Sequence, residues 1–557
     1  MNRKWWGWGD PDRLDPVEGH PELFEFLKRQ LVLPEGSSYP RVDESQVRLP
    51  EGRLSAELLA ELGRLCSPQA VKTDSLTRLT HSAGMGYKDL LWIRRGSLRD
   101  YVDAVVFPGS EREVLDVVRL CDRSMVEVIP YGGGSSVVGS FEVIRKQGQG
   151  VISMDMGGMH RLVALDPASL TATFEAGVSG PELESQLAAR GMTLGHFPQS
   201  FEYSTLGGWI ATRSAGSSSN IYGKIEDMVL SMKVATPHGM LEMVTVPKSA
   251  AGPDLRQLFI GSEGILGVIT QATVAVHRSP PVRRFSSFLF KSFDEGLACV
   301  RELVQGGLRN TTLRLSDSNE TNSFFHSRGK AVALSSRMKE AVGLWLVSRR
   351  GLSFEKGSLL IAISEGDAQN VENDLSRLRA TCRAHHGFSL GSSPAQAWLE
   401  SRFEQPYLRD SLLDHGIMVD TLETATVWSK VVQLHDAVAV AITTELEKRG
   451  KSALVMCHIS HTYNTGSSLY FTFMAAQEPG RELEQWEAVK EAASWAIVTN
   501  GGTISHHHGV GLEHSKWMVR EDGEQGVAAL QALKAYLDPR GIMNPGKLLP
   551  TGEVGTA

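Results

Sequence analysis

The sequence has 557 residues, of which 41% are hydrophobic and 22% are charged, and its formal net charge at pH 7 is −7. A chain of this length and composition is expected to fold into two or more globular domains. Basic and acidic residues are interspersed without any basic block, so a nucleic-acid-binding surface is not expected. An anionic substrate would have to be bound by individual cationic side chains.

Cysteine usage and the ends of the sequence favour a reducing compartment. The five cysteines have no metal or redox spacing and are predicted to be reduced core thiols; they are Cys66, Cys121, Cys299, Cys382 and Cys457. The first residues lack the apolar core of a signal peptide, and no run of about eighteen apolar residues predicts a membrane span. The ending GEVGTA is not a peroxisomal tripeptide. We therefore expect a cytoplasmic protein.

Residues 1–99 are predicted to form a helical N-terminal segment. Trp5, Trp6 and Trp8 lie beside basic residues, which fits either a membrane-interface anchor or packing on the body of the protein, and we favour packing. Leucines at helical spacing predict one helix within 20–33 and another within 55–66, with Ser55 as the N-cap of the second.

From residue 100 the pattern changes to alternating strands and helices. A β-branched run leads into residues 131–136, where three consecutive glycines expose backbone amides that can bind an anion. A second segment, 195–227, interleaves glycines and hydroxyls with apolar residues, which suits a backbone packed against a large planar ligand. A third segment, 261–269, places glycines around Glu263 and enters a strand. Each segment alone is also typical of a structural turn, and none fits the P-loop or dinucleotide pattern.

The second half of the chain is divided by composition. The paired prolines Pro280 and Pro281 predict a domain boundary, after which long helical stretches between strands predict an α/β substrate or cap domain over 281–490. Within it, the basic and apolar segment 325–351 fits a mobile lid, a lipid-surface segment or an ordinary exposed helix. The final segment, 491–557, carries three consecutive histidines and a predicted helix that stops at Pro539.

The histidines His506, His507 and His508 form the most unusual local composition in the chain. Side chains alternate direction in an extended segment, so at most two of the three share a face. No Cys or His-Glu-x-x-His motif supports a metal site, and we expect no metal. The ordinary pKa of histidine suits proton transfer or anion binding instead.

Three further residues can contribute chemistry. Tyr470 falls on the strand face opposite Leu469 and Phe471, and the pattern alone is typical of a core tyrosine. Arg409 can bind a phosphate bidentately, or it can form a salt bridge with Asp410. Arg314 lies in a strand-like segment that does not distinguish a structural from a chemical role.

The three glycine-containing segments, in this order, resemble the FAD-binding domain of the vanillyl-alcohol-oxidase/PCMH-type flavoproteins. Further motifs are similar to the alkyldihydroxyacetonephosphate synthase family from about residue 6 to 549: FPQSFEYSTLGGWIATRSAG, KSAAGPDL, IMVDTLET, SHHHGVG and DPRGIMNPGKLL. The resemblance implies a fold of mixed α+β and α/β class. It consists of a two-subdomain PCMH-type FAD-binding domain over 100–280 and an α/β substrate (cap) domain over 281–490, with helical terminal segments. The last segment, 491–557, would return to the FAD domain.

The resemblance also implies site residues. Tyr470 aligns with the family's catalytic acid/base, the histidines 506–508 with its active-site loop, Arg409 with its substrate-binding arginine, and Arg314 with a further position near the site. The first glycine-rich loop would hold the FAD pyrophosphate, and the later two segments would surround the ribityl chain and the isoalloxazine ring. The expected cofactor-binding residues are Pro130, Tyr131, Gly132, Gly133, Gly134, Ser135, Ser136, Gln199, Ser200, Ser204, Thr205, Gly207, Gly208, Thr212, Arg213, Ser214, Ala215, Glu263, Gly264, Gly267, Val268 and Ile269. Because no histidine stands in the loop 131–136, noncovalent FAD is expected.

The activity that the resemblance implies is the exchange of the acyl chain of acyl-dihydroxyacetone phosphate for a long-chain fatty alcohol. The reaction would pass through a covalent adduct on flavin N5. The alcohol would then form the ether bond of ether lipids, without net redox change. Two long tails would need an apolar tunnel and favour peripheral association with a membrane surface, and we allow for a homodimer. The main alternative is an FAD-dependent 2-hydroxy-acid dehydrogenase or oxidase on the same scaffold. A flavin-binding protein without catalysis is disfavoured, because Tyr470, Arg409 and the histidines occur together.

Overall fold

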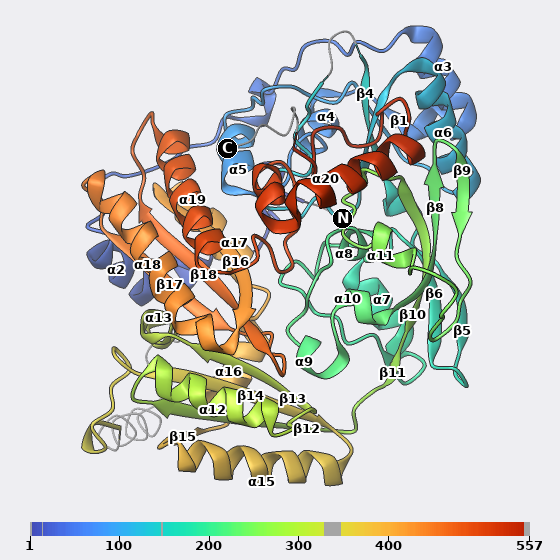
Figure 1. The fold of residues 1–557 in the computed structure, drawn as a ribbon. Coiled ribbons are helices and arrows are strands. Elements are labelled where there is room, and N and C mark those ends of the chain that lie inside the picture. The colour runs from blue at the N-terminus through green and yellow to red at the C-terminus, as the bar shows by residue number, and fades with distance from the viewer. Residues whose placement is uncertain (1–2, 14, 146–148, 328–346, 551–557) are drawn as a thin grey trace.

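Two groups of β-sheets divide the molecule, and the chain crosses between them more than once (Figure 1). The computed structural model describes residues 3–13, 15–145, 149–327 and 347–550. Most of the segment 325–351 therefore lies outside the described residues, and the three interpretations of it stay predictions.

The first sheet carries the first glycine-rich loop at the end of a buried strand. Its strand order is β1-β2-β4-β3, in which β2, β4 and β3 are parallel and β1 is antiparallel to β2. The bounds are β1 Val71–Lys72, β2 Ala104–Val106, β3 Glu127–Tyr131 and β4 Val151–Asp155. The continuous apolar run in β3 is typical of a parallel strand covered on both faces. Helices α3 (Ala56–Leu65) and α6 (Glu111–Ser124) pack on this sheet.

The second sheet is antiparallel and holds the other two segments near the first loop. Its order is β5-β6-β10-β8-β9, beside a two-stranded ladder of β11 and β7. The bounds are β5 Leu162–Asp166, β6 Thr171–Glu175, β7 Met192–Thr193, β8 Val229–Thr236, β9 Gly239–Glu242, β10 Val268–Ala275 and β11 His277–Arg278. Helix α7 (Gly180–Ala188) begins after its N-cap Ser179. Short helices complete this part: α8 Leu206–Ala211, α9 Ser219–Tyr222, α10 Ile225–Met228 and α11 Arg256–Phe259.

The third sheet has seven strands and is antiparallel throughout, in the order β15-β12-β14-β13-β17-β18-β16. The strand bounds are β12 Val282–Phe290, β13 Thr311–Ser316, β14 Ser358–Gly366, β15 Phe388–Gly391, β16 Ile417–Val427, β17 Ala453–Ile459 and β18 Gly466–Ala476. Its helices are α12 Phe293–Gln305, α13 Ser318–Ser327, α15 Ala368–Ala384, α16 Ser393–Ser401, α17 Gln405–Asp414, α18 Val431–Lys448 and α19 Glu482–Thr499.

Alternation along these strands gives the third sheet two different faces. Leu469, Phe471 and Phe473 of β18 pack with α12, α15, α18 and α19 in one large hydrophobic core. Tyr470 and Thr472, which alternate with them, line a cavity on the opposite face. The predicted orientation of Tyr470 is thereby confirmed.

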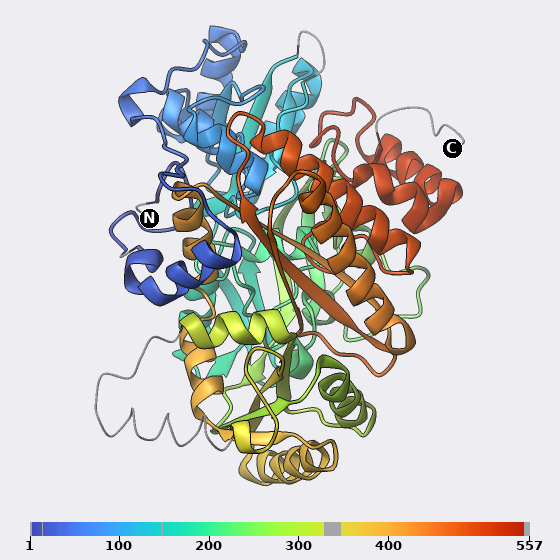
Figure 2. The ribbon, with the colours of Figure 1, turned by 90° about the vertical axis from the view of Figure 1, so that its left-hand side faces the viewer.

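Both terminal segments pack far from their sequence neighbours. Helices α1 (Pro16–Gly19) and α2 (Pro21–Gln30) lie beside α17 and α13 of the third sheet's half (Figure 2). Trp5 and Trp8 are only 6% and 4% exposed, so the prediction that they pack on the body is confirmed. Helix α20 (Met518–Leu537) lies against the first half of the molecule (Figure 1), where Met543 forms a parallel bridge with Val128.

Local predictions in the N-terminal segment are also confirmed. Helices α2 and α3 lie within the predicted stretches, and the Ser55 side chain accepts from Leu58 N at 3.2 Å as the N-cap of α3. Two further helices, α4 Ser75–Thr80 and α5 Tyr87–Arg94, follow.

The cysteines are free thiols, four of them buried. Their wide spacing in sequence concealed one contact, because α12 and α15 bring Cys299 Sγ to 3.7 Å from Cys382 Sγ. In the described part of the chain, no helix combines the length and the apolar character needed to cross a membrane.

Candidate active site

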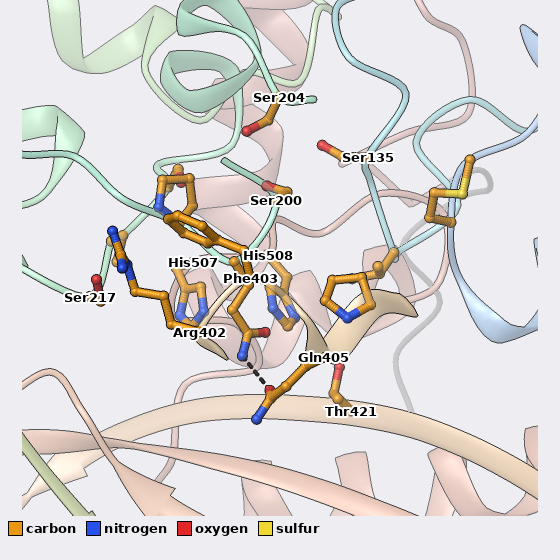
Figure 3. A pocket seen from close by; sticks show the side chains of 18 of the residues that line it. Ser135, Ser200, Ser204, Ser217, Arg402, Phe403, Gln405, Thr421, His507 and His508 are labelled. Atoms are coloured by element: carbon orange, nitrogen blue, oxygen red, sulfur yellow. Dashed lines mark hydrogen bonds between the residues drawn. The ribbon is translucent and has the colours of Figure 1, made fainter. Parts of the chain in front are cut away.

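A cavity of about 870 Å³ lies where the two groups of sheets meet. Its walls include residues from the first sheet's loop, from the segments 195–227 and 261–269, and from the face of the third sheet that carries Tyr470. Most predicted site residues line it: Pro130, Tyr131, Gly132, Gly133, Gly134, Ser135, Ser136, Gln199, Ser200, Ser204, Thr205, Gly207, Gly208, Thr212, Ser214, Ala215, Glu263, Gly264, Gly267, Val268, Ile269, Arg314, Arg409, Tyr470, His507 and His508. In Figure 3, Ser135, Ser200 and Ser204 appear above His507 and His508, and Thr421 appears below them.

Two predicted residues are not among the described residues that line this cavity, Arg213 and His506. Arg213 has a positive φ of 53°, and its Nη2 donates to Gln257 Oε1 at 2.9 Å and to Gln257 O at 3.3 Å. The motif therefore predicted its place in the chain but not the direction of its side chain. His506 turns away from the cavity, toward the Tyr463 hydroxyl at 2.6 Å from its Nε2.

The first loop packs so tightly that side chains are excluded. A Cβ on Gly133 would lie 1.9 Å from the Tyr203 carbonyl oxygen, and one on Gly132 would lie 2.4 Å from Thr205 Oγ1. Thr205 in turn caps α8 by accepting from Gly208 N at 3.3 Å. The backbone of this loop is therefore held directly against the second segment, as expected for a cradle that a ligand approaches closely.

The third segment also links the cradle to the histidine loop. Glu263, with φ of 49°, accepts from Val510 N at 2.5 Å and from Gly511 N at 2.7 Å. Burial raises the pKa of this carboxyl to about 7, although these two N–H donors favour its charged form. Glu263 therefore anchors the downstream end of the histidine loop in addition to lining the cavity.

A second carboxylate, Glu423 of β16, holds the histidines themselves. It accepts from Ser505 Oγ at 2.7 Å, His507 N at 3.1 Å and His508 N at 2.8 Å, and also from His506 N. Glu423 is only 4% exposed. Its place in the motif IMVDTLET gave no sign of this role, because the partners are over 80 residues away in sequence.

Burial keeps the histidines neutral. The pKa values of His506 and His507 are lowered well below the ordinary value, first by burial and then by neighbouring histidines, and burial also lowers the pKa of His508. The rings of His507 and His508 have centroids 4.6 Å apart. They therefore present uncharged imidazoles that can accept or donate a proton at the cavity wall.

Tyr470 lies beside this pair. Its ring centroid is 5.9 Å from that of His507 and 5.5 Å from that of His508, and its hydroxyl donates to Gln199 Oε1 at 3.2 Å. The Gln199 amide donates in turn to Gln405 Oε1 at 2.5 Å (dashed in Figure 3). Burial raises the pKa of the Tyr470 hydroxyl to about 12, so at neutral pH it is a proton donor.

The two predicted arginines differ in how they are paired. Arg314 Nη2 donates to Glu320 Oε1 at 2.8 Å. Burial alone would raise the pKa of Glu320, but Arg314, His458 and hydrogen bonds together lower it to about 2. Arg409, on α17, has a buried Nε that lacks a hydrogen-bond partner among the described residues. Arg409 is therefore the better candidate for an anionic group of a ligand.

Sequence reasoning missed another cation at the cavity, Arg402. Its guanidinium carbon lies 4.2 Å from the ring centroid of Phe403 and 5.6 Å from that of Phe197, and burial lowers its pKa to about 10. No local signal in the sequence distinguishes Arg402 from other surface arginines.

Part of the cavity wall is apolar, although Arg314, Glu320 and Ser323 line the cavity from the same half of the molecule. The apolar side chains come from helices α2, α13 and α17 and from strands of the third sheet: Leu23, Leu27, Phe324, Leu359, Ile361, Leu408, Leu412, Val419, Met456 and Met474. A polar end with arginine, tyrosine and histidines thus continues into a wall suited to hydrocarbon.

Comparisons with known proteins agree with this arrangement. Residues 102–245 match the model of the FAD binding domain, and residues 279–548 match that of the C-terminal domain of FAD linked oxidases. The chain is 34% identical to an alkyldihydroxyacetonephosphate synthase of Trypanosoma brucei brucei, covering 98% of this chain and 92% of that protein. A solved structure of an alkyldihydroxyacetonephosphate synthase superposes with a TM-score of 0.83 at 32% identity, over 98% of this chain and 97% of that one.

A more distant likeness concerns the fold alone. The structure of p-cresol methylhydroxylase with substrate bound superposes with a TM-score of 0.68 at 15% identity, over 93% of this chain and 99% of that chain. The predicted fold class, a PCMH-type FAD-binding domain with a substrate domain, is confirmed by these likenesses. The predicted cofactor, FAD, is confirmed by the two matching domain models.

Proposed function

The chain belongs to the alkyldihydroxyacetonephosphate synthase family, and on this premise we propose that it replaces the acyl chain of acyl-dihydroxyacetone phosphate with a long-chain fatty alcohol. The C–O bond to the acyl carboxylate breaks, a C–O bond to the alcohol oxygen forms, and the alcohol loses its proton. The products are alkyl-dihydroxyacetone phosphate and a fatty acid, with no net oxidation. The observation that carries the proposal is that Arg409, Tyr470, His508 and apolar side chains line the same cavity.

The residues present fit FAD. Glycines whose Cβ atoms would collide with the second segment form the cradle, and hydroxyl side chains line the same end of the cavity. When bound, the flavin supplies covalent catalysis without net redox change. We propose that it is held noncovalently, because residues 131–136 contain no histidine. Acid precipitation tests this, and flavin that remains in the protein pellet would contradict it.

The protein's own groups divide the remaining tasks. Arg409 would bind the phosphate of the substrate, since guanidinium and phosphate geometries match bidentately. The protonated Tyr470 hydroxyl would donate to the departing carboxylate, and the neutral His508 imidazole would accept the proton of the incoming alcohol. The apolar wall would hold the hydrocarbon chains and exclude water from the exchange.

Two long hydrocarbon chains also bear on where the enzyme works. Such substrates reside in bilayers, and we propose that the protein associates peripherally with a membrane surface to take them up. Flotation with liposomes tests this, and an enzyme that neither floats with them nor is stimulated by them would contradict it. A homodimer stays a prediction, to be measured by sedimentation.

Incubation with palmitoyl-dihydroxyacetone phosphate and labelled hexadecanol tests the activity. We expect labelled alkyl-dihydroxyacetone phosphate without consumption of oxygen. Absence of that product, together with bleaching of the flavin by D-lactate or glycolate, would assign the protein to the 2-hydroxy-acid dehydrogenases instead.

A further inference from the structure

Three imidazoles from two separate segments, one buried and two half-buried, converge beside the cavity. His461 lies just after β17, and His506 and His507 belong to the histidine loop. One ring nitrogen of each lies within 4.8 Å of those of the other two. The ring centroids are 5.2 Å apart for His461 and His506 and 5.3 Å apart for His461 and His507, and the two Nδ1 atoms of His506 and His507 are 3.0 Å apart.

The ring nitrogens of these histidines can bind a metal ion through their lone pairs. A neutral imidazole has one ring nitrogen whose lone pair is free to bind a metal ion. Within the described part of the structure, the buried Nδ1 of His461 has no hydrogen-bond partner. A buried polar atom without a partner is costly, and a ligand that accepts its lone pair removes that cost.

The surroundings resemble the outer shell of a metal site. The ring nitrogen of His506 that faces away from His507 contacts the Tyr463 hydroxyl at 2.6 Å, which fixes the ring as outer hydrogen bonds do for metal-binding histidines. Glu423 holds the backbone of the loop and places its Oε2 3.6 Å from His507 Nδ1, which adds a negative charge.

Nearby positive charge opposes a cation. Lys224 Nζ donates to His506 O at 2.9 Å. Its charge is partly offset, because Glu226 Oε1 lies 3.1 Å from the same nitrogen, although the same oxygen also lies 3.9 Å from Arg213 Nη1. The carboxylates Glu423 and Glu226 therefore offset the two cations without exceeding them.

We propose that His461, His506 and His507 bind one divalent transition-metal ion of the Zn²⁺ class, with a fourth position open to the cavity. Neutral imidazole is a preferred ligand for such ions, and three protein ligands with one open position are typical of catalytic rather than structural zinc. Tetrahedral coordination at about 2.1 Å would bring the nitrogens to about 3.4 Å from one another, a small rotation from the observed positions. The fourth position faces the cavity because His461 and His507 both line it.

The sequence-based expectation of no metal rested on the three adjacent histidines alone. The structure changes the ligand set, since His508 points to the cavity separately and His461, which lies 45 residues before His506, supplies the third nitrogen. A bound ion would lower the pKa of a water or alcohol at its fourth position. The site does not depend on the proposed reaction, because metal uptake is measurable without substrate.

The experiment uses the full-length flavoprotein, dialysed against chelator and then against metal-free buffer. Zn²⁺ is titrated by calorimetry, and Co²⁺ is added to read the intense visible bands of a four-coordinate site at wavelengths beyond the flavin absorption. The variant is His461→Gln, and the matched control is His458→Gln, which alters a buried histidine three residues earlier whose Nδ1 instead contacts Glu320 at 2.9 Å.

We expect one Zn²⁺ per chain and a four-coordinate Co²⁺ spectrum for the wild type and for His458→Gln, and at least a hundredfold weaker binding for His461→Gln. Flavin content and circular dichroism report folding, and His507→Gln replaces His461→Gln if that variant loses its flavin. A wild type that takes up no stoichiometric metal overturns the proposal, as does a folded His461→Gln or His507→Gln variant that binds like the wild type. A wild-type protein that takes up the metal but forms no ether product would contradict the proposed function and leave the metal site supported.

Discussion

Glu423 and Tyr470 stand directly opposite each other in the antiparallel ladder between β16 and β18. Directly paired residues point to the same face of a sheet, so this one pair brings together the carboxylate that holds the histidine loop and the hydroxyl that lies beside it. The loop and the tyrosine are therefore positioned by the same two strands, although His506 follows Tyr470 by 36 residues in the sequence.

Replacing Glu423 with Gln is expected to lower ether-forming turnover while flavin binding is retained. An amide keeps the size of the side chain but replaces one accepting oxygen with a donor, which faces backbone N–H groups. Hydrogen bonds to a charged group are each worth about 1.5–3 kcal/mol, so a loss of about 10- to 100-fold follows. Turnover is measured with labelled alcohol and normalised to flavin content.

Glu521→Gln serves as the control for Glu423→Gln. Glu521 accepts from Thr503 Oγ1 at 2.6 Å and from Ile504 N at 3.0 Å, upstream of the histidines, and we expect little loss of turnover from this change. Equal losses in the two variants would show that Glu423 has no special role in positioning the histidines.

Tyr470→Phe is expected to abolish most turnover, by about 100-fold or more, because a positioned proton donor contributes on that scale. The phenyl ring keeps the packing against His458, whose centroid is 4.9 Å away. Flavin content should therefore stay at the wild-type level. Tyr222→Phe removes a comparable hydroxyl that donates to Glu365 outside the cavity, and it should remain active. An active Tyr470→Phe variant would exclude the proton-transfer role.

Arg409→Lys is expected to raise the KM for acyl-dihydroxyacetone phosphate by about tenfold or more, with a smaller effect on kcat. Lysine keeps the charge but cannot bind phosphate bidentately, so binding weakens. The control is Arg283→Lys. It changes an ion pair in which Arg283 Nε lies 2.7 Å from Glu365 Oε2. Steady-state kinetics that show an unchanged KM in Arg409→Lys would move the phosphate site elsewhere, with Arg402 as the next candidate.

These residues show what the sequence could and could not predict. Period-two alternation placed Tyr470 correctly, and the capping preference of serine placed Ser55 at the start of its helix, because both depend on near neighbours. Alternation failed for the histidines. An extended segment would place His506 and His508 on one face, but the chain bends at 506–508 and the adjacent pair His507 and His508 lines the cavity.

The remaining site residues depend on contacts that no local pattern encodes. Glu423 acts on residues more than 80 positions away, and His461 joins the histidine loop only because the turn between β17 and β18 brings it there. Arg213 was predicted to bind the cofactor because it belongs to a cofactor motif. Its left-handed backbone instead turns the side chain toward Gln257. A motif fixes the position of a backbone segment better than the direction of each side chain.

Gly133→Ala is expected to yield protein without flavin. The added Cβ would lie 1.9 Å from a backbone oxygen of the second segment, which cannot move aside as a flexible side chain would. The ratio of flavin to protein absorbance measures the effect. Gly109→Ala, whose added Cβ would meet only the Glu113 carboxylate at 3.7 Å, should keep its flavin. A yellow Gly133→Ala variant would show that the loop can relax.

The pH dependence of stability should report the buried carboxyl of Glu263. Its folded pKa of about 7 lies above the reference value of 4.5, so between these pH values the folded state binds more protons than the unfolded state. The contribution of Glu263 to stability is therefore greatest below about pH 4.5, falls as the pH rises, and is lost above about pH 7. The whole shift corresponds to about 3 kcal/mol.

Glu263→Gln removes this titration and keeps an oxygen that can accept from Val510 N or Gly511 N. The free energy of unfolding of the variant, relative to the wild type, should accordingly rise between pH 5 and pH 8. Urea unfolding of the holoprotein followed by tryptophan fluorescence measures it at each pH. Glu372→Gln, an exposed position on α15, should leave the wild-type pH profile unchanged. If Glu263→Gln shows that same profile, the carboxyl does not titrate in this range, and its two backbone N–H donors, rather than burial, set its pKa in the folded protein.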